Sequence, residues 1–155
     1  MGKGLGALGA AVAVVALAVG VVTPAAGSSA NNHQHHTFRV DAVITELNLV
    51  NAGSGPSLGD EIVFSNKLLQ GGNKVGHEGA VCTTVSLQRQ EANCVATFSF
   101  SGGQITAQAL VTLGSKAPYA VAITGGSGKY DGAAGEIQTR PVSGTEGILT
   151  FDLQD

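Results

Sequence analysis

From Thr37 onward, apolar and polar residues alternate with a period of two, and turn-forming residues separate the alternating stretches. This alternation is typical of strands with one buried face, and the regular spacing is typical of a barrel or sandwich. We expect strands near residues 37–50, 60–69, 78–88, 94–101, 104–113, 118–124, 134–142 and 147–153. Closing eight strands removes the unpaired sheet edges and leaves room for one small ligand. We therefore predict an all-β fold: a single eight-stranded antiparallel β-barrel with a small apolar cavity.

Polar residues interrupt the apolar rows of the first two predicted strands. Even positions are apolar from Phe38 to Ile44, and Glu46 and Asn48 follow on the same face. Asn66 interrupts the even face of the second strand in the same way. If all three face inward, they form the small polar cluster that orients a ligand in an apolar cavity. A bulge near Glu46 is the open alternative, because it would turn Glu46 and Asn48 out to solvent.

The first thirty residues follow a different pattern. Lys3 precedes an uncharged run of Ala, Val, Leu and Gly from Leu5 to Val22, and small residues come next. This order predicts a secretory signal peptide, cleaved after Gly27 or after Ala30. An uncleaved membrane anchor is the alternative, because the run is about as long as a minimal spanning helix. No later segment is apolar and long enough to span, so we expect a secreted protein without stable membrane insertion after cleavage.

The expected organisation is a signal peptide at residues 1–30, a flexible His-containing tail at 31–37 and a barrel domain at 38–155. If cleavage follows Ala30, the new amine, two backbone amides and the His33 imidazole have the square-planar arrangement that Cu(II) and Ni(II) favour. The competing interpretation is a solvated tail whose histidines bind nothing. We predict no other metal site and no cofactor.

Charge and cysteine content limit the function further. Charged residues make up 12% of the chain, the net charge is −3 and there are 23 glycines. This composition disfavours a nucleic-acid binder and a helical bundle. Cys82 and Cys94 share one parity on expected hairpin neighbours, which predicts a disulfide in an oxidising compartment. A short turn near Gln90 would instead pair Cys94 with a residue near Leu87, and a free pocket cysteine at Cys82 is the rival interpretation.

Four segments resemble the allene oxide cyclase family, in the same order along the chain. They are Leu58–Leu68, Val75–Cys82, Ala96–Phe100 and the Gly-rich Ala122–Ala133, which dirigent proteins share in looser form. The resemblance covers roughly residues 40–153 and implies an eight-stranded antiparallel barrel around an apolar cavity. It also implies a homotrimer.

The resemblance implies catalytic roles for Glu46, Asn48 and Asn66. Family members use the two Asn positions to hold a water against the substrate epoxide, and the Glu is thought to steady positive charge as the ring opens. The resemblance also places Pro56 and Cys82 in the ligand pocket.

Phe64 and Phe98 complete the expected ligand-binding wall. A family tyrosine, three residues after the Gln of the fifth strand, is absent here, because Val111 stands three residues after Gln108.

The expected function is binding of a hydrophobic small molecule and its cyclisation or isomerisation without a cofactor, which would make the chain an isomerase. One alternative is a dirigent-like protein that steers coupling of radicals made by another enzyme. A second is a secreted binder of lipids or metabolites with no catalysis. Related barrels host several functions, so the choice depends on the site.

Overall fold

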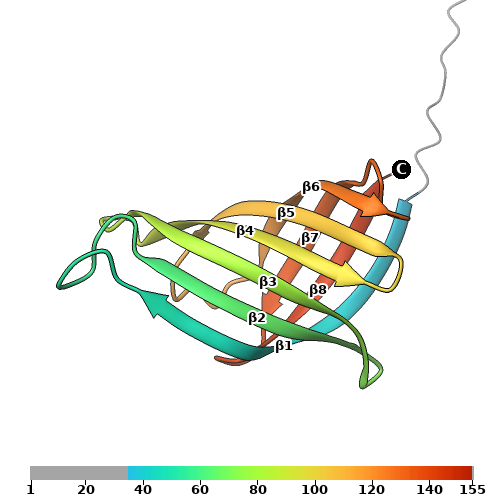
Figure 1. Ribbon diagram of the computed structural model, residues 1–155, viewed down its shortest axis with the longest axis horizontal. Helices are drawn as coiled ribbons and strands as arrows, with labels where there is room; N and C mark the ends of the chain where they lie inside the picture. Colours follow the sequence, from blue (N-terminus) through green and yellow to red (C-terminus); the bar gives the residue numbers. More distant parts are fainter. Residues whose placement is uncertain (1–34, 155) are drawn as a thin grey trace, which may run out of the picture. The chain divides into compact units, whose positions relative to one another are not determined.

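The computed structural model describes residues 35–154, which form eight strands (Figure 1). Their bounds are β1 His35–Val50, β2 Glu61–Gln70, β3 Asn73–Ser86, β4 Glu91–Phe100, β5 Gly103–Thr112, β6 Tyr119–Gly128, β7 Ala134–Pro141 and β8 Glu146–Gln154. No helix in this range is long and apolar enough to cross a membrane. The predicted signal peptide and the predicted metal ligand His33 lie outside the described residues.

Each strand pairs antiparallel with its neighbours in the sequence, and β1 pairs with β8, so the sheet is a closed barrel. The prediction of a single eight-stranded antiparallel barrel is therefore confirmed. Short connections explain this order, because antiparallel neighbours need only a tight turn. Gly71 and Gly72 form such a turn between β2 and β3, with φ of 57° and 80°. Both angles are unfavourable for residues with a side chain, which is why glycine occupies them.

Three expected boundaries are wrong. Because the Gly71–Gly72 turn is so tight, β3 begins at Asn73 rather than near 78. The segment 35–37, which we expected in the flexible tail, belongs to β1, and His35 lies opposite Gln154 of β8. The sixth strand does not end near 124, because β6 continues to Gly128 and pairs with β5.

Gly126 allows the chain to turn sharply after β6. A side chain there would collide with the carbonyl oxygens of Tyr130 and Gln104. Glycine is therefore required for close backbone packing, and the Gly-rich segment needs no ligand to explain it.

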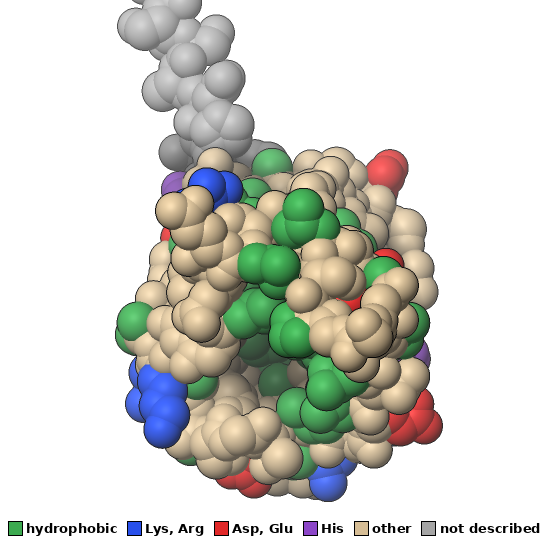
Figure 2. All heavy atoms as spheres, turned by 90° about the vertical axis from the view of Figure 1, so that its left-hand side faces the viewer, with side chains coloured by type: hydrophobic (Ala, Val, Ile, Leu, Met, Phe, Trp, Pro, Cys, Tyr) green, Lys and Arg blue, Asp and Glu red, His purple; other side chains and the backbone are tan. Residues whose placement is uncertain are grey.

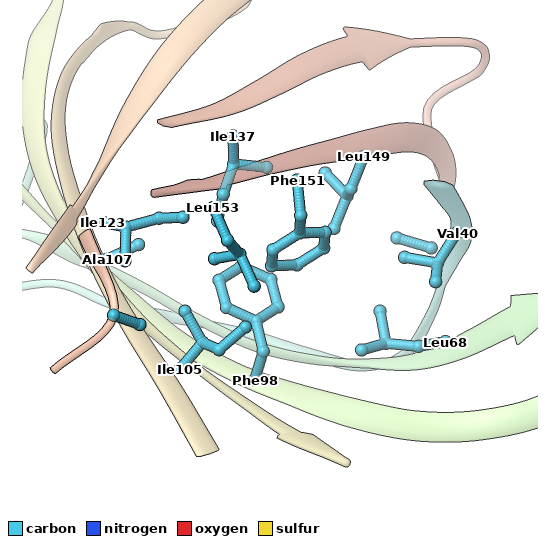
Figure 3. Close-up of a cluster of buried hydrophobic side chains, with 12 residues drawn as sticks. Val40, Leu68, Phe98, Ile105, Ala107, Ile123, Ile137, Leu149, Phe151 and Leu153 are labelled. Atoms are coloured by element: carbon cyan, nitrogen blue, oxygen red, sulfur yellow. The ribbon is translucent and has the colours of Figure 1, made fainter. Parts of the chain in front are cut away.

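Buried apolar side chains fill one end of the barrel (Figure 3). Phe151 is fully buried on β8. Its ring stacks on Phe38 at a centroid distance of 4.6 Å and meets Phe98 edge-on at 5.0 Å. Such aromatic pairs add about 0.5–1.5 kcal/mol to the stabilisation that burial provides. This aromatic plug, consisting of Phe38, Phe98, Phe100 and Phe151, lies where β1 begins and where β4 and β8 end.

A β-bulge interrupts β1 on the way to the other end of the barrel. The register against β2 shifts between Ile44 and Glu46, so Ile44 lies opposite Asn66 while Glu46 lies opposite Ser65. The hydroxyl of Thr45 donates to the carbonyl oxygen of Ser65 at 3.1 Å and satisfies it at the irregularity. From here to Val50, the odd-numbered side chains of β1 share the inward parity of Phe64 and Ile62.

Candidate functional site

A cavity of about 390 Å³ lies beyond the aromatic plug and opens at the opposite end of the barrel. All eight strands contribute side chains to its lining, and most of these side chains are apolar. Figure 2 shows the opening as a hollow surrounded by hydrophobic side chains. Its volume falls within the usual range for small-molecule pockets, roughly 300–1,000 Å³.

Glu78 and Asn66 form a buried polar pair in the cavity wall. They lie directly opposite each other on β3 and β2. Asn66 Nδ2 donates a hydrogen bond of 2.7 Å to Glu78 Oε2, and the two residues are only 8% and 6% exposed. Burial raises the pKa of Glu78 from 4.5 to about 7, and the Asn66 hydrogen bond only partly offsets this rise. Glu78 is therefore close to half-protonated at neutral pH, which suits a group that gives and takes protons.

Asn66 keeps one unused polar atom. Its Oδ1 is buried and has no hydrogen-bond partner in the structure. Leaving a buried acceptor unpaired costs about 1–3 kcal/mol. An unpaired buried acceptor of this kind is rare in native proteins and marks Asn66 as a position of interest in the cavity wall.

Tyr119 brings a second titratable group to the cavity from β6. Tyr119 is 38% exposed, and its side chain is hydrogen-bonded to Thr139 of β7, which also lines the cavity. Burial raises the pKa of the Tyr119 hydroxyl, the negative charge of Glu78 raises it further, and the Thr139 hydrogen bond lowers it in part. The hydroxyl therefore remains a protonated donor over the physiological pH range.

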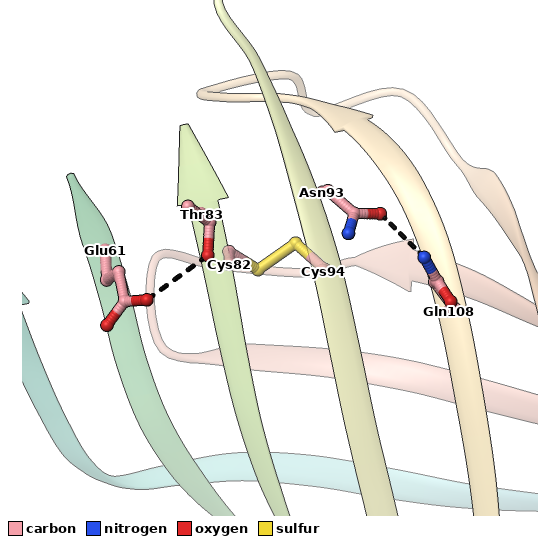
Figure 4. Close-up of a disulfide and its surroundings, with 6 residues drawn as sticks. All are labelled: Glu61, Cys82, Thr83, Asn93, Cys94 and Gln108. Atoms are coloured by element: carbon pink, nitrogen blue, oxygen red, sulfur yellow. Dashed lines mark hydrogen bonds between the residues drawn. A yellow bond between two sulfur atoms is a disulfide. The ribbon is translucent and has the colours of Figure 1, made fainter. Parts of the chain in front are cut away.

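The predicted disulfide between Cys82 and Cys94 is present in the structure and lies in the cavity wall (Figure 4). The two cysteines are directly opposite each other on β3 and β4. The expected register obstacle does not arise, because β3 carries an irregularity between Thr84 and Ser86 and the turn follows only at 87–90. Cys82 thus contributes a disulfide sulfur to the cavity rather than a free thiol.

The structure does not place Glu46 and Asn48 among the residues lining the cavity. Both side chains are exposed, and Glu46 Oε2 accepts a hydrogen bond from the outward-facing Ser65 hydroxyl at 3.4 Å. Leu47 lines the cavity instead. The expectation of a continuous inward even face is therefore wrong beyond Thr45, and the bulge alternative is the arrangement observed. Of the three candidate catalytic residues, only Asn66 faces the cavity.

The four predicted ligand-binding residues divide between two hollows. Phe64, Cys82 and Phe98 line the main cavity. Pro56 lines a second hollow of about 530 Å³, which we call the mouth hollow, on the loop side of the barrel opening. Ile62 lines both hollows, which are therefore adjacent.

Asp60 holds the loop that forms one side of the mouth hollow. Its carboxylate accepts hydrogen bonds from the backbone N–H groups of Ala52 and Ser57 at 2.7 and 2.8 Å, and from the Ser57 hydroxyl at 2.7 Å. The Ala52 bond and the two Ser57 bonds lower the pKa of Asp60. Asp60, which belongs to the family-like segment Leu58–Leu68, thus stabilises the loop.

Sequence analysis missed Glu78 and Tyr119. The signal for Glu78 was its parity, because it shares the even face of β3 with Ala80 and Cys82, which are both buried. We had placed Glu78 at the very start of its strand, where parity carries little weight. Nothing in the local pattern around Tyr119 identified it. Residues 35–154 contain no cluster of three or more His, Cys, Asp or Glu side chains arranged to hold a metal ion.

Comparisons with known proteins agree with this architecture. The family described as allene oxide cyclase barrel like domain matches residues 40–151. Among solved structures, pyocyanin demethylase is 28% identical, with a TM-score of 0.68 over 76% of this chain and 99% of its own. The exo-specific intermolecular Diels-Alderase AbnU is 13% identical, with a TM-score of 0.61 over 79% of this chain and 99% of its own.

A dirigent protein has the same fold. The pterocarpan synthase dirigent protein GePTS1 is 20% identical, with a TM-score of 0.57 over 78% of this chain and 87% of its own. A comparison with proteins of curated function finds no match to this sequence. At these identities the Diels-Alderase and the dirigent protein share the fold alone.

Proposed function

Because the chain belongs to the allene oxide cyclase-like barrel family, we propose that it binds a hydrophobic small molecule in the cavity and cyclises or isomerises it without a cofactor. One observation carries the proposal: the Glu78–Asn66 pair is the buried polar feature of an otherwise largely apolar cavity. The names of the similar proteins agree with a small organic substrate, since they describe a demethylase, a Diels-Alderase and a dirigent protein.

Glu78 supplies the acid and the base of the proposed reaction. Near neutral pH its protonated form donates a proton to an oxygen or an unsaturated carbon of the ligand, and the carboxylate that results removes a proton from a second position. The net result is a shifted double bond and a regenerated carboxyl. In a cyclisation, the same carboxylate offsets the positive charge that develops when the protonated oxygen leaves its carbon.

Asn66 and the apolar walls position the reactants. The Asn66 amide orients the Glu78 carboxyl through its 2.7 Å hydrogen bond. The rings of Phe64 and Phe98 restrict the conformations of a flexible ligand and favour those in which the reacting atoms are close. The Tyr119 hydroxyl supplies a further donor from the opposite wall.

The test begins with ligand identification. Full-length protein is incubated with a lipophilic extract of the producing cells, and native mass spectrometry identifies the retained compound, whose conversion is then followed by chromatography. Glu78→Gln should reduce conversion at least about a hundredfold, the usual range for loss of an acid–base group. Asn66→Leu should also reduce conversion, because it removes the amide that orients the Glu78 carboxyl.

The outer face of β1 offers matched controls for these variants. Glu46→Gln and Asn48→Leu change the same residue types outside the cavity and should convert the compound like the wild type. If these two variants lose activity while Glu78→Gln keeps it, the proposed site is wrong and the roles implied by family resemblance apply instead.

Dirigent-like action is the second candidate, and the acidic mouth favours it. Asp60 and Glu61 line the mouth hollow, and Glu146 lines the main cavity near the same opening. An open acidic groove could hold two radicals for stereoselective coupling. An added one-electron oxidant and a monophenol would produce unequal amounts of enantiomeric dimers if this function applies, and equal amounts if it does not. Binding without turnover or coupling would support the non-catalytic binder.

We also propose that the chain is secreted and forms a homotrimer. The pattern of residues 1–30 and the disulfide support secretion into an oxidising compartment. A shallow hollow on the outside of β3–β6 supports self-association, because no charged side chain lines it and Val95, one of its lining residues, is 48% exposed. N-terminal sequencing of secreted material and light scattering test these two proposals.

A further inference from the structure

The charges around the two hollows all have one sign. Four acidic side chains line them, Glu78 and Glu146 in the cavity and Asp60 and Glu61 in the mouth hollow. Within residues 35–154, no Lys, Arg or His side chain lines either hollow. An anionic ligand would therefore enter a negative potential and lie beside Glu78 with no cation to balance it, whereas a cationic ligand would find its counter-ion at the inner end of the path.

The Glu78–Asn66 pair also needs donors. Asn66 Nδ2 is occupied by its bond to Glu78 Oε2, while the buried Asn66 Oδ1 has no partner. Glu78 and Asn66 lie opposite each other on neighbouring strands and both line the cavity, so their carboxylate and amide oxygens are acceptors close to one another. A protonated nitrogen with two N–H groups matches two adjacent acceptors, and hydrogen bonds to a charged group are the stronger kind.

We propose that the ligand of this cavity is an apolar nitrogen base, such as an amine, an amidine or an amino-substituted heteroaromatic ring, bound as a cation with N–H groups directed at Glu78 and Asn66 Oδ1. This inference rests on the proposed function for occupation of the cavity and adds the chemical class of the ligand. A neutral base takes its proton from the Glu78 carboxyl. A base that arrives already protonated displaces that proton to solvent, and both routes end in the same ion pair.

Binding should therefore strengthen with pH. The groups that face Glu78 are Asn66 from β2 and, through its charge, Tyr119 from β6, while Glu146 of β8 lies at the opening. Tyr119 stays protonated in this range and Glu146 is exposed. Ionisation of Glu78 is therefore the change that alters the affinity for the cation. Affinity for a base that stays protonated over this pH range should rise as Glu78 ionises and then level off.

Four bicyclic aromatic probes of similar size separate the effects of charge, N–H donors and apolar fit. They are 4-aminoquinoline, which is protonated at neutral pH and carries N–H donors, the donor-free cation N-methylquinolinium, neutral naphthalene and anionic 1-naphthoate. Calorimetric titration of the full-length, disulfide-intact protein at pH 8 should show 4-aminoquinoline binding at least about tenfold more tightly than N-methylquinolinium or naphthalene, and 1-naphthoate binding most weakly. Glu78→Gln should reduce the advantage of 4-aminoquinoline to about twofold and abolish its pH dependence, whereas Glu46→Gln should change neither.

The outcomes distinguish the two proposals. If naphthalene binds the wild type but 1-naphthoate binds as tightly as 4-aminoquinoline, the cavity proposal stands and the nitrogen-base inference is overturned. If N-methylquinolinium equals 4-aminoquinoline, the assignment of N–H donors to Asn66 Oδ1 is overturned. If none of the four probes binds, the proposed function itself fails. Unchanged naphthalene affinity in Glu78→Gln shows that the variant folds with its cavity intact.

Discussion

Glu78 makes the stability of the barrel depend on pH in an unusual direction. The folded protein holds the Glu78 proton up to about pH 7, whereas the ordinary value for the group is 4.5. Between these two values the folded state binds more protons than the unfolded state, so the free energy of unfolding falls as the pH rises. The stabilisation is fully present below pH 4.5 and is lost as the pH passes about 7.

The size of this effect follows from the same shift. Each pKa unit corresponds to 1.36 kcal/mol, so a rise from 4.5 to about 7 predicts a loss of about 3 kcal/mol between pH 4.5 and pH 8. Glu78→Gln keeps the size of the side chain and removes the titration. The variant should therefore match or fall below the wild type at pH 4.5 and exceed it at pH 8.

Urea unfolding followed by far-ultraviolet circular dichroism measures both curves, since the chain has no Trp to report by fluorescence. Glu46→Gln is the control, because it changes an exposed carboxyl on the outer face of β1 and should titrate in parallel with the wild type. Parallel curves for wild type and Glu78→Gln across this range would refute the reasoning, because they would show that Glu78 ionises near its ordinary pKa and that the cavity is more polar than its lining suggests.

Three further substitutions test the structural parts around the site. Phe151→Ala removes the fully buried ring of the aromatic plug and should lower the free energy of unfolding by about 3–5 kcal/mol; a loss below about 1 kcal/mol in urea unfolding would contradict the packing described. Replacing Cys82 and Cys94 together by Ser opens a disulfide that spans 12 residues, and non-reducing thermal unfolding should show a loss of about 3 kcal/mol, whereas an unchanged transition would argue against the bridge. Asp60→Ala frees the Ser57 amide, so hydrogen exchange should accelerate in this loop and not in the barrel core, and unaltered protection of Ser57 would show that other groups hold the loop.

Strand parity was enough to predict the barrel and part of the site. Period-two alternation identified eight strands, because each strand has one face toward solvent and one toward the barrel interior. The same parity correctly predicted that Phe64 and Asn66 face inward and that Cys82 and Cys94 share a face.

The β1 bulge could not be predicted from the sequence, because a bulge is defined by the register between two paired strands. Thr45 fits a regular strand equally well, and the irregularity depends on how β1 is aligned with Ser65 on the partner strand. One extra residue reverses the direction of every later side chain, so Glu46 and Asn48 moved from candidate site to outer face. Glu78 was missed for a related reason, because the true start of β3 depends on how tightly the Gly71–Gly72 turn joins it to β2.

The aromatic plug closes one end of the barrel formed by residues 35–154, so the cavity is a pocket that opens at the other end. A molecule that enters between the acidic groups at the mouth cannot leave past Phe38 and Phe151, because their rings are stacked across the far end. In the proposed reaction, reactant and product therefore use the same opening in turn, and the product competes with the next reactant for the cavity. Product release through this opening is then part of every turnover of the proposed reaction, and a cavity of about 390 Å³ that is closed at one end suits short molecules rather than chains threaded through the barrel.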